Sequence, residues 1–97
     1  MEKLTEAQIA ASLTSLPEWQ VFGGKLVRQY RFMTFGQAMS FVNMVAYIAE
    51  KHDHHPDIDI RYDRVTLSLW THDASGITRR DLRFAAALES AEDRKAD

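Results

Sequence analysis

The chain has 97 residues, of which 45% are hydrophobic and 27% are charged, and this is the composition of a single folded domain over residues 1–97 rather than of a disordered segment. Twelve Lys and Arg residues against fourteen Asp and Glu residues give a formal net charge of −2, which argues against direct binding of nucleic acid or of a membrane surface. Cysteine is absent, which excludes disulfides, thiolate nucleophiles and thiolate metal sites.

The first predicted helix begins after Thr5. Thr5 and Gln8 have the spacing of a capping box, in which each side chain satisfies the backbone amide of the other residue at a helix start. We expect this helix to end at Leu16, because a residue that precedes a proline, here Pro17, disfavours the helical conformation.

A β-hairpin and a second helix follow. Residues 19–22 and 25–32 are predicted as strands, because the Gly-Gly pair between them readily adopts the positive φ angles of a two-residue turn. The second helix begins at Thr34, which again has a glutamine, Gln37, three residues later. Apolar residues then recur at helical spacing and predict a helix that runs to about Lys51.

A second hairpin is predicted from the alternation of apolar and polar residues. The apolar positions are Ile58, Ile60, Tyr62, Val65, Leu67 and Leu69. A two-residue turn at Asp63-Arg64 would place Tyr62 opposite Val65 and gather all six on one buried face. Extended beyond the strands, the same register would place His55 opposite His72.

A third helix is predicted to begin at Thr78, with Asp81 in its first turn. The order of elements is therefore α-β-β-α-β-β-α. This order predicts an α+β fold of two layers, in which a four-stranded antiparallel sheet carries three helices on one face. Such a sheet leaves its edges exposed and the core is small, so we expect a homodimer or a larger assembly.

All four histidines of the chain fall in one short stretch. The predicted hairpin returns His55 and His72 to one end of the sheet, with His54 beside them. Glu50 lies four residues before His54, within reach if the helix continues that far, and Asp81 follows the short loop after His72. Imidazoles and carboxylates gathered at one rim are the groups of a general acid–base site.

Other interpretations of these residues are open on the sequence alone. Histidines with carboxylates also suit zinc, although adjacent histidines tend to point apart and no helix carries a His-x-x-x-His pair. Helix capping alone would explain Asp81, and a surface position would explain His52. Trp70 is typical of a subunit contact, and the arginines at positions 79, 80 and 83 are typical of a solvated helix face.

The spaced set of residues resembles the signature of the pterin-4a-carbinolamine dehydratases. The matching residues are Glu50, His54, His55, Pro56, Tyr62, His72 and Asp81. Further matches run from Trp19 to Thr78. The resemblance implies an α+β fold, assembly as dimers or as tetramers built from dimers, and no metal or organic cofactor. The implied activity is dehydration of 4a-hydroxytetrahydropterin to quinonoid dihydropterin, which recycles the cofactor of aromatic amino-acid hydroxylases.

The resemblance also implies which residues form the site. Catalysis would fall to His54, His55 and His72, and the substrate-binding positions would be Glu50, Asp53, Pro56, Thr71, Asp73 and Asp81. Loss of the 4a-hydroxyl needs an acid at the leaving oxygen and a base for the ring proton, and imidazoles fill both roles near neutral pH. We expect His54 and His72 to act as acids from opposite sides of the ring, and His55 to position the substrate.

A protein-binding module is the alternative to an enzyme. Members of the family also act as dimerisation partners of transcription factors, and relatives that lost the histidines act as assembly factors. The expected partners are therefore a pterin substrate, further copies of the chain, and a hydroxylase or a transcription factor. The longest unbroken apolar run, residues 44–49, is far below the ~20 residues that span a bilayer, so we expect a cytoplasmic location.

Overall fold

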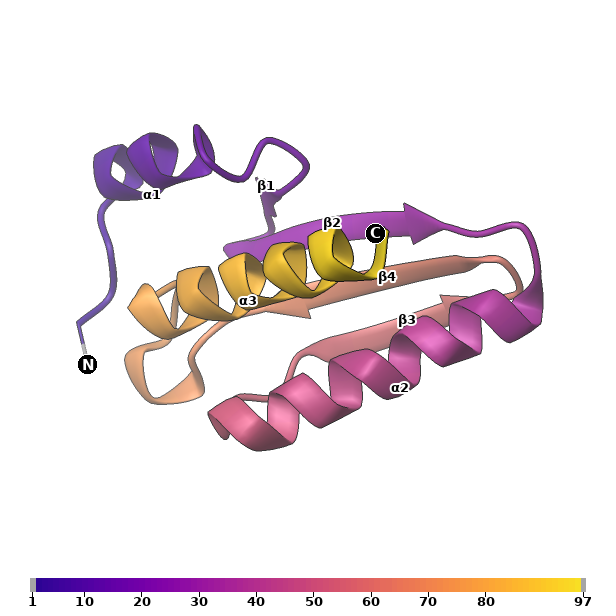
Figure 1. The fold of residues 1–97 in the computed structure, drawn as a ribbon. Coiled ribbons are helices and arrows are strands. Elements are labelled where there is room, and N and C mark those ends of the chain that lie inside the picture. The colour runs from indigo at the N-terminus through magenta and orange to yellow at the C-terminus, as the bar shows by residue number, and fades with distance from the viewer. Residues whose placement is uncertain (1, 97) are drawn as a thin grey trace.

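The computed structural model describes residues 2–96, and it describes side chains as far as Glu92. Its elements are α1 (Glu6–Leu13), β1 (Gln20–Phe22), β2 (Lys25–Arg31), α2 (Phe35–His52), β3 (Asp57–Arg61), β4 (Arg64–Leu69), a short 3₁₀ turn η1 (His72–Ala74) and α3 (Arg79–Ala96). The strands form one antiparallel sheet in the order β1-β2-β4-β3. This arrangement confirms the predicted α+β fold (Figure 1).

The helices cover one face of the sheet, and α2 and α3 lie side by side across it (Figure 1). The core includes the inward strand residues Leu26, Val65, Leu67 and Leu69, together with Val45 of α2 and Phe84 of α3. The opposite face carries exposed polar side chains such as Gln29 and Asp59. No helix within residues 2–96 is both long and apolar enough to cross a bilayer.

The predicted start of α1 is confirmed, but its predicted end is wrong. Oγ1 of Thr5 accepts a hydrogen bond from the Gln8 amide at 3.2 Å, and Oε1 of Gln8 accepts one from the Thr5 amide at 2.9 Å. The helix ends at Leu13 rather than Leu16, because the amides of the next three residues bond to carbonyls three residues back instead of four. The Thr14 hydroxyl also donates to the Ala11 carbonyl at 2.7 Å. The restriction that Pro17 places on the conformation of Leu16 therefore falls in a turn that follows the helix.

The way in which α2 ends sets the positions of His54 and His55. Asp53 follows the helix with a φ of 49°, a left-handed conformation. Its amide donates to the Glu50 carbonyl at 3.3 Å, and the His54 amide donates to the Ala49 carbonyl at 3.1 Å. This pair of bonds is the Schellman motif, which reverses the chain at a helix end. The reversal carries His54 back toward the core instead of continuing the helix.

The register of the second hairpin differs from the prediction by two residues. Ile60 pairs with Val65 and Arg61 pairs with Arg64, so the turn is Tyr62-Asp63 rather than Asp63-Arg64. A shift of two preserves which side chains face inward, and the alternation of apolar residues therefore cannot distinguish the two registers. The carbonyl of Asp63 accepts a hydrogen bond from the Phe32 amide at 2.8 Å, which ties this turn to the end of β2.

Two consequences of the new register correct the prediction. Tyr62 sits in the turn with a φ of 54° and is 69% exposed, so it is not part of the buried face. Extended beyond the strands, the pairing places His55 opposite Trp70, not opposite His72. The strand β3 is an edge of the sheet, and its apolar side chains Ile58 and Ile60 remain 36% and 38% exposed.

Candidate active site

Three segments converge at one end of the sheet, on the left in Figure 1. There α2 ends at His52, β4 ends at Leu69 and leads into η1, and α3 begins at Arg79. The chain therefore brings together residues 53–55, 70–73 and 78–81, and these short stretches contain most of the predicted site.

A buried contact between His54 and Asp81 lies at the centre of this convergence. Nε2 of His54 is 2.6 Å from Oδ1 of Asp81, and the two side chains are 9% and 0% exposed. The other carboxylate oxygen of Asp81, Oδ2, accepts a hydrogen bond from the Thr78 amide at 2.8 Å. Asp81 therefore caps α3 and also contacts His54, so capping alone does not explain this residue.

Two threonine hydroxyls complete the surroundings of Asp81. The Thr71 hydroxyl donates to Oδ2 of Asp81 at 2.9 Å, and it lies 2.7 Å from the Thr78 hydroxyl. Both threonines are buried. The Thr71 amide donates to the Gly76 carbonyl at 2.8 Å, which closes the loop that carries η1. The aspartate is thus held by groups on both sides of this loop.

His55 and Glu50 form an exposed pair at the rim. Nε2 of His55 lies 3.7 Å from Oε1 of Glu50, and the two side chains are largely open to water. Sequence spacing predicted that Glu50 would approach His54 instead. The helix does not continue that far, because the left-handed Asp53 turns His54 inward and leaves His55 beside Glu50.

His72 lies in the first position of η1 and is exposed. Its ring packs against the indole of Trp70, with the ring centroids 4.7 Å apart and the planes inclined at 57°. The ammonium group of Lys25 lies 5.4 Å from the centre of the same indole. Trp70 therefore supports the position of His72 from within one chain.

A hollow of about 250 Å³ unites these groups. Its lining residues are Asp53, His54, His55, Trp70, Thr71, His72, Asp73 and Arg80. The three predicted catalytic histidines thus open onto one cavity, although the predicted register that was to bring His55 and His72 together is wrong. Of the predicted substrate-binding residues, Glu50, Pro56 and Asp81 lie outside this lining, and Asp81 lies behind His54.

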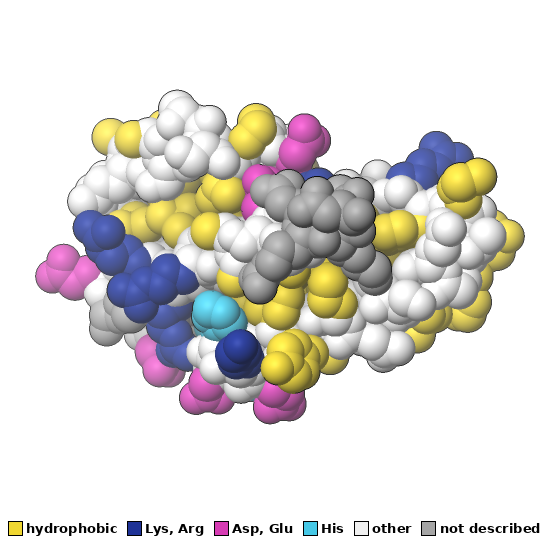
Figure 2. All heavy atoms as spheres, viewed as in Figure 1, with side chains coloured by type: hydrophobic (Ala, Val, Ile, Leu, Met, Phe, Trp, Pro, Cys, Tyr) yellow, Lys and Arg dark blue, Asp and Glu magenta, His cyan; other side chains and the backbone are white. Residues whose placement is uncertain are grey.

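Arg80 makes a contact that the pattern of a solvated helix face does not predict. Its guanidinium donates to the carbonyl of Asp53 at 2.5 Å, which joins the first turn of α3 to the chain reversal after α2. The only sequence signal for this contact was its position next to Asp81. Figure 2 shows Lys and Arg side chains gathered beside a histidine at this end of the molecule.

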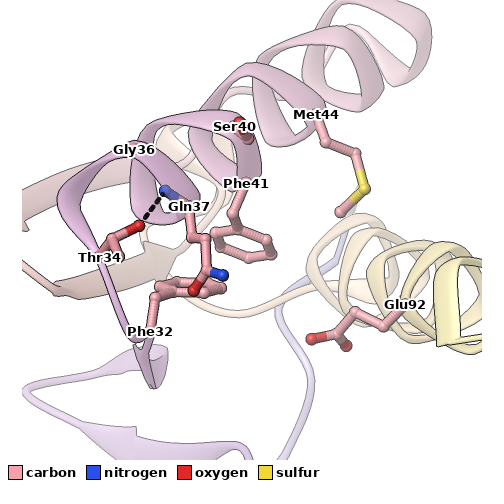
Figure 3. A pocket seen from close by; sticks show the side chains of 8 residues that line it. All are labelled: Phe32, Thr34, Gly36, Gln37, Ser40, Phe41, Met44 and Glu92. Atoms are coloured by element: carbon pink, nitrogen blue, oxygen red, sulfur yellow. Dashed lines mark hydrogen bonds between the residues drawn. The ribbon is translucent and has the colours of Figure 1, made fainter.

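A larger cavity of about 750 Å³ opens between α2 and α3, away from the histidines. Figure 3 shows that Phe32, Phe41 and Met44 provide much of its wall, with Glu92 at one side. It has no imidazole among its lining residues, so the acid–base groups lie at the smaller hollow. Within the described residues, no three His, Asp or Glu side chains are grouped closely enough to hold a metal ion.

Comparison with known proteins decides the family. Residues 2–91 match the model of the family described as "Pterin 4 alpha carbinolamine dehydratase". The chain belongs to this family. Two bacterial relatives that carry the dehydratase family's name have 48% identity over 89 residues (Chloroflexus aurantiacus) and 52% identity over 88 residues (Thermomicrobium roseum). These alignments cover 92% and 91% of the chain, and 96% and 95% of the relatives.

Solved structures agree with the assignment to the pterin-4a-carbinolamine dehydratase family. A transcriptional coactivator/pterin dehydratase from Brucella melitensis superposes with a TM-score of 0.85 at 34% identity, over 92% of this chain and 97% of that one. A pterin dehydratase-like RuBisCO assembly factor of the alpha-carboxysome superposes with a TM-score of 0.61 at 20% identity, over 74% of this chain and 83% of that one. The second similarity shows the fold alone.

Proposed function

We propose that this protein dehydrates 4a-hydroxytetrahydropterin to quinonoid dihydropterin by histidine acid–base catalysis, a step in recycling the cofactor of aromatic amino-acid hydroxylases. The observation that carries the proposal is the common hollow of His54, His55 and His72, with His54 paired to a buried carboxylate. Family membership supports the same reaction, because dehydration of this carbinolamine gives the family its name.

The reaction suits the groups around the hollow. The C4a–O bond breaks as the lone pair of N5 forms the C4a=N5 bond, and the leaving oxygen departs as water once an acid has protonated it. A nitrogen of the ring then gives up a proton to a base, so that the net loss is one water molecule. Hydroxide is a poor leaving group, and proton transfer from a positioned imidazole typically contributes a factor of ~10²–10⁴.

The positions of the side chains suggest a division of roles. His54 is shielded and fixed by Asp81, whereas His72 is exposed and supported by Trp70 from another part of the rim. In this proposal the two act as acids from opposite sides of the pterin ring, and His55 positions the substrate. Asp53 and Asp73 also line the hollow, and a carboxylate suits the N–H edge of the 2-amino-pyrimidinone ring.

Stopped-flow absorbance with freshly generated 4a-carbinolamine tests the function. The protein is expected to accelerate the dehydration over buffer, and His54→Ala and His72→Ala are expected to lower kcat more than they raise KM. His52→Ala is a matched control, because His52 is exposed and does not line the hollow. No acceleration by the wild-type protein, or equal rates for all variants, would refute the proposal.

A second candidate function is protein binding, with self-association as its basis. Apolar side chains remain exposed along the β3 edge at Ile58 and Ile60. In the turn that follows this strand, Phe35 stacks on Tyr62 with 6.5 Å between ring centroids. We propose that this surface forms a homodimer or homotetramer. A transcription factor is a further candidate partner, because the similar protein from Brucella melitensis is described as a transcriptional coactivator. Light scattering of Ile60→Lys against wild type tests the self-association, and an unchanged molar mass would refute it.

A further inference from the structure

We infer that Thr71 and Thr78 act through Asp81 as positioning residues for His54. The Thr71 hydroxyl bonds to the buried carboxylate and the Thr78 hydroxyl orients that of Thr71, so that Nε2 of His54 keeps its proton and Nδ1 is left as the nitrogen that exchanges a proton with the substrate. The part of the inference that concerns the substrate rests on the proposed function. The hydrogen-bond network itself does not.

Counting protons gives the direction of each bond. A carboxylate only accepts hydrogen bonds, so the single hydroxyl proton of Thr71 goes to Oδ2 of Asp81, 2.9 Å away. The Thr78 hydroxyl, 2.7 Å from that of Thr71, must then donate to Thr71. Oγ1 of Thr78 in turn accepts from the Arg80 amide at 3.2 Å. Each hydroxyl therefore has one defined orientation.

The same count defines the state of His54. Oδ1 of Asp81 lies 2.6 Å from Nε2, and a lone pair on that nitrogen would face the lone pairs of the carboxylate. Neutral His54 therefore carries its proton on Nε2. Among the described residues no group bonds to Nδ1, whereas the backbone amide of His54 is already paired with the Ala49 carbonyl. Nδ1 is then the ring nitrogen of His54 that is available to a substrate in the hollow.

Burial makes the network sensitive to each hydroxyl. Thr78 and Asp81 are completely buried and Thr71 is 4% exposed, so bulk water cannot replace a lost donor. The arrangement also exceeds what helix capping needs. A capping box uses the contact of Oδ2 with the Thr78 amide, but it needs neither the Thr71 hydroxyl nor a histidine at Oδ1. The additional bonds are directed to His54.

Thr71 also links the two proposed acids. It immediately precedes His72, and its amide and hydroxyl anchor the start of the η1 loop to Gly76 and to Asp81. A change in the hydroxyl of Thr71 therefore disturbs the support of His54 directly, while the backbone bond that holds the loop remains. This separation allows the role of the hydroxyl to be tested by itself.

The test compares Thr71→Val, which removes the hydroxyl at nearly constant volume, with Thr71→Ser, which keeps it. Long-range ¹H–¹⁵N NMR of the imidazoles reports the tautomer of neutral His54, assigned from its loss in His54→Gln. We expect the Nε2–H tautomer in wild type and Thr71→Ser, and a mixture of tautomers in Thr71→Val. Since one hydrogen bond to a charged group is lost, kcat should fall about 10-fold in Thr71→Val with little change in KM.

The controls separate this inference from the proposed function. Thr66→Val makes the same substitution on the exposed face of β4 and should leave both the spectrum and kcat unchanged. If Thr71→Val does not fold, the tautomer of His54 in the wild-type spectrum still tests the inference. An Nδ1–H tautomer in wild type, or an unchanged tautomer in folded Thr71→Val, would overturn the inference. A protein with the expected tautomers but no dehydratase activity would refute the proposed function and leave the network standing.

Discussion

Nε2 of His54 lies 2.6 Å from Oδ1 of Asp81, although 27 residues separate the two in the sequence. One partner follows the chain reversal at the end of α2, and the other lies in the first turn of α3. The contact therefore depends on the packing of these two helices against the sheet. It fixes one imidazole of the proposed site in a shielded position, while His55 and His72 stay accessible at the rim.

Replacing Asp81 by Asn should reduce catalysis strongly. The amide is close in size but is neutral, and its NH₂ group can face the ring nitrogen and favour the wrong tautomer of His54. We expect kcat to fall about 100-fold, the lower end of the ~10²–10⁴-fold that a positioned acid–base group typically contributes. Stopped-flow kinetics measure the change, with Asp59→Asn on the exposed face as the control. A wild-type kcat in Asp81→Asn would contradict the role given to this pair.

Two substitutions of Asp53 should separate its role in substrate binding from its role in the backbone conformation after α2. Asp53→Gly and Asp53→Ala both remove the carboxylate of a residue that lines the hollow, so both should raise KM. Only glycine adopts the φ of 49° without cost, and a left-handed alanine is less stable by about 1 kcal/mol. Denaturant unfolding should therefore show a lower free energy of unfolding for Asp53→Ala than for Asp53→Gly. Equal stabilities would contradict the backbone argument, and unchanged KM values would contradict the binding role.

The exposed pair of Glu50 and His55 should contribute little to stability. Both side chains are largely in water and Nε2 of His55 is 3.7 Å from Oε1 of Glu50, so Glu50→Gln should change the free energy of unfolding by less than about 1 kcal/mol. Urea unfolding at low and high salt measures this. A larger loss in the free energy of unfolding at low salt, which disappears at high salt, would show that the pair stabilises the fold, contrary to this expectation.

Tyr30 should make the protein sensitive to high pH. Burial raises the pKa of its phenol well above the usual range, and the nearby Glu92 carboxylate raises the pKa further. Above the pKa of about 10 in the unfolded chain, the unfolded state loses a proton that the folded state retains, so the free energy of unfolding falls as pH rises. This part of the fall is about 1.4 kcal/mol per pH unit.

The contribution of Tyr30 can be isolated by mutation. Tyr30→Phe lacks the ionising hydroxyl, so its free energy of unfolding should fall less steeply as the pH rises above about 10. Tyr62→Phe is the control, because the side chain of Tyr62 is exposed in its turn. If the free energy of unfolding falls equally with pH in wild type and in Tyr30→Phe, the raised pKa of Tyr30 is contradicted.

Local sequence signals predicted most of the fold. The capping residues Thr5 and Thr34 and the glycine pair at the first turn mark features whose causes lie within a few residues, and the structure has them where expected. The register of β3 against β4 depends instead on the turn at Tyr62-Asp63 and on its bond to β2. An even shift leaves the alternation of apolar side chains unchanged, so no local pattern could reveal it.

The site was predictable in composition but not in its contacts. The clustering of histidines indicated acid–base chemistry, and the three converge on one hollow. The partner of His54 was less accessible to sequence reasoning, because the left-handed Asp53 turns the histidine away from Glu50 and toward Asp81. The bond from Arg80 to the Asp53 carbonyl likewise depends on how α3 packs beside the end of α2.

A crystal structure of the protein with bound dihydropterin is the most direct test of the central claim that the histidine hollow is the site of dehydration. We expect the pterin ring in this hollow, between His54 and His72, with its amino-pyrimidinone edge toward Asp53 or Asp73. A ring seated in the apolar cavity between α2 and α3, out of reach of every histidine, would contradict the claim.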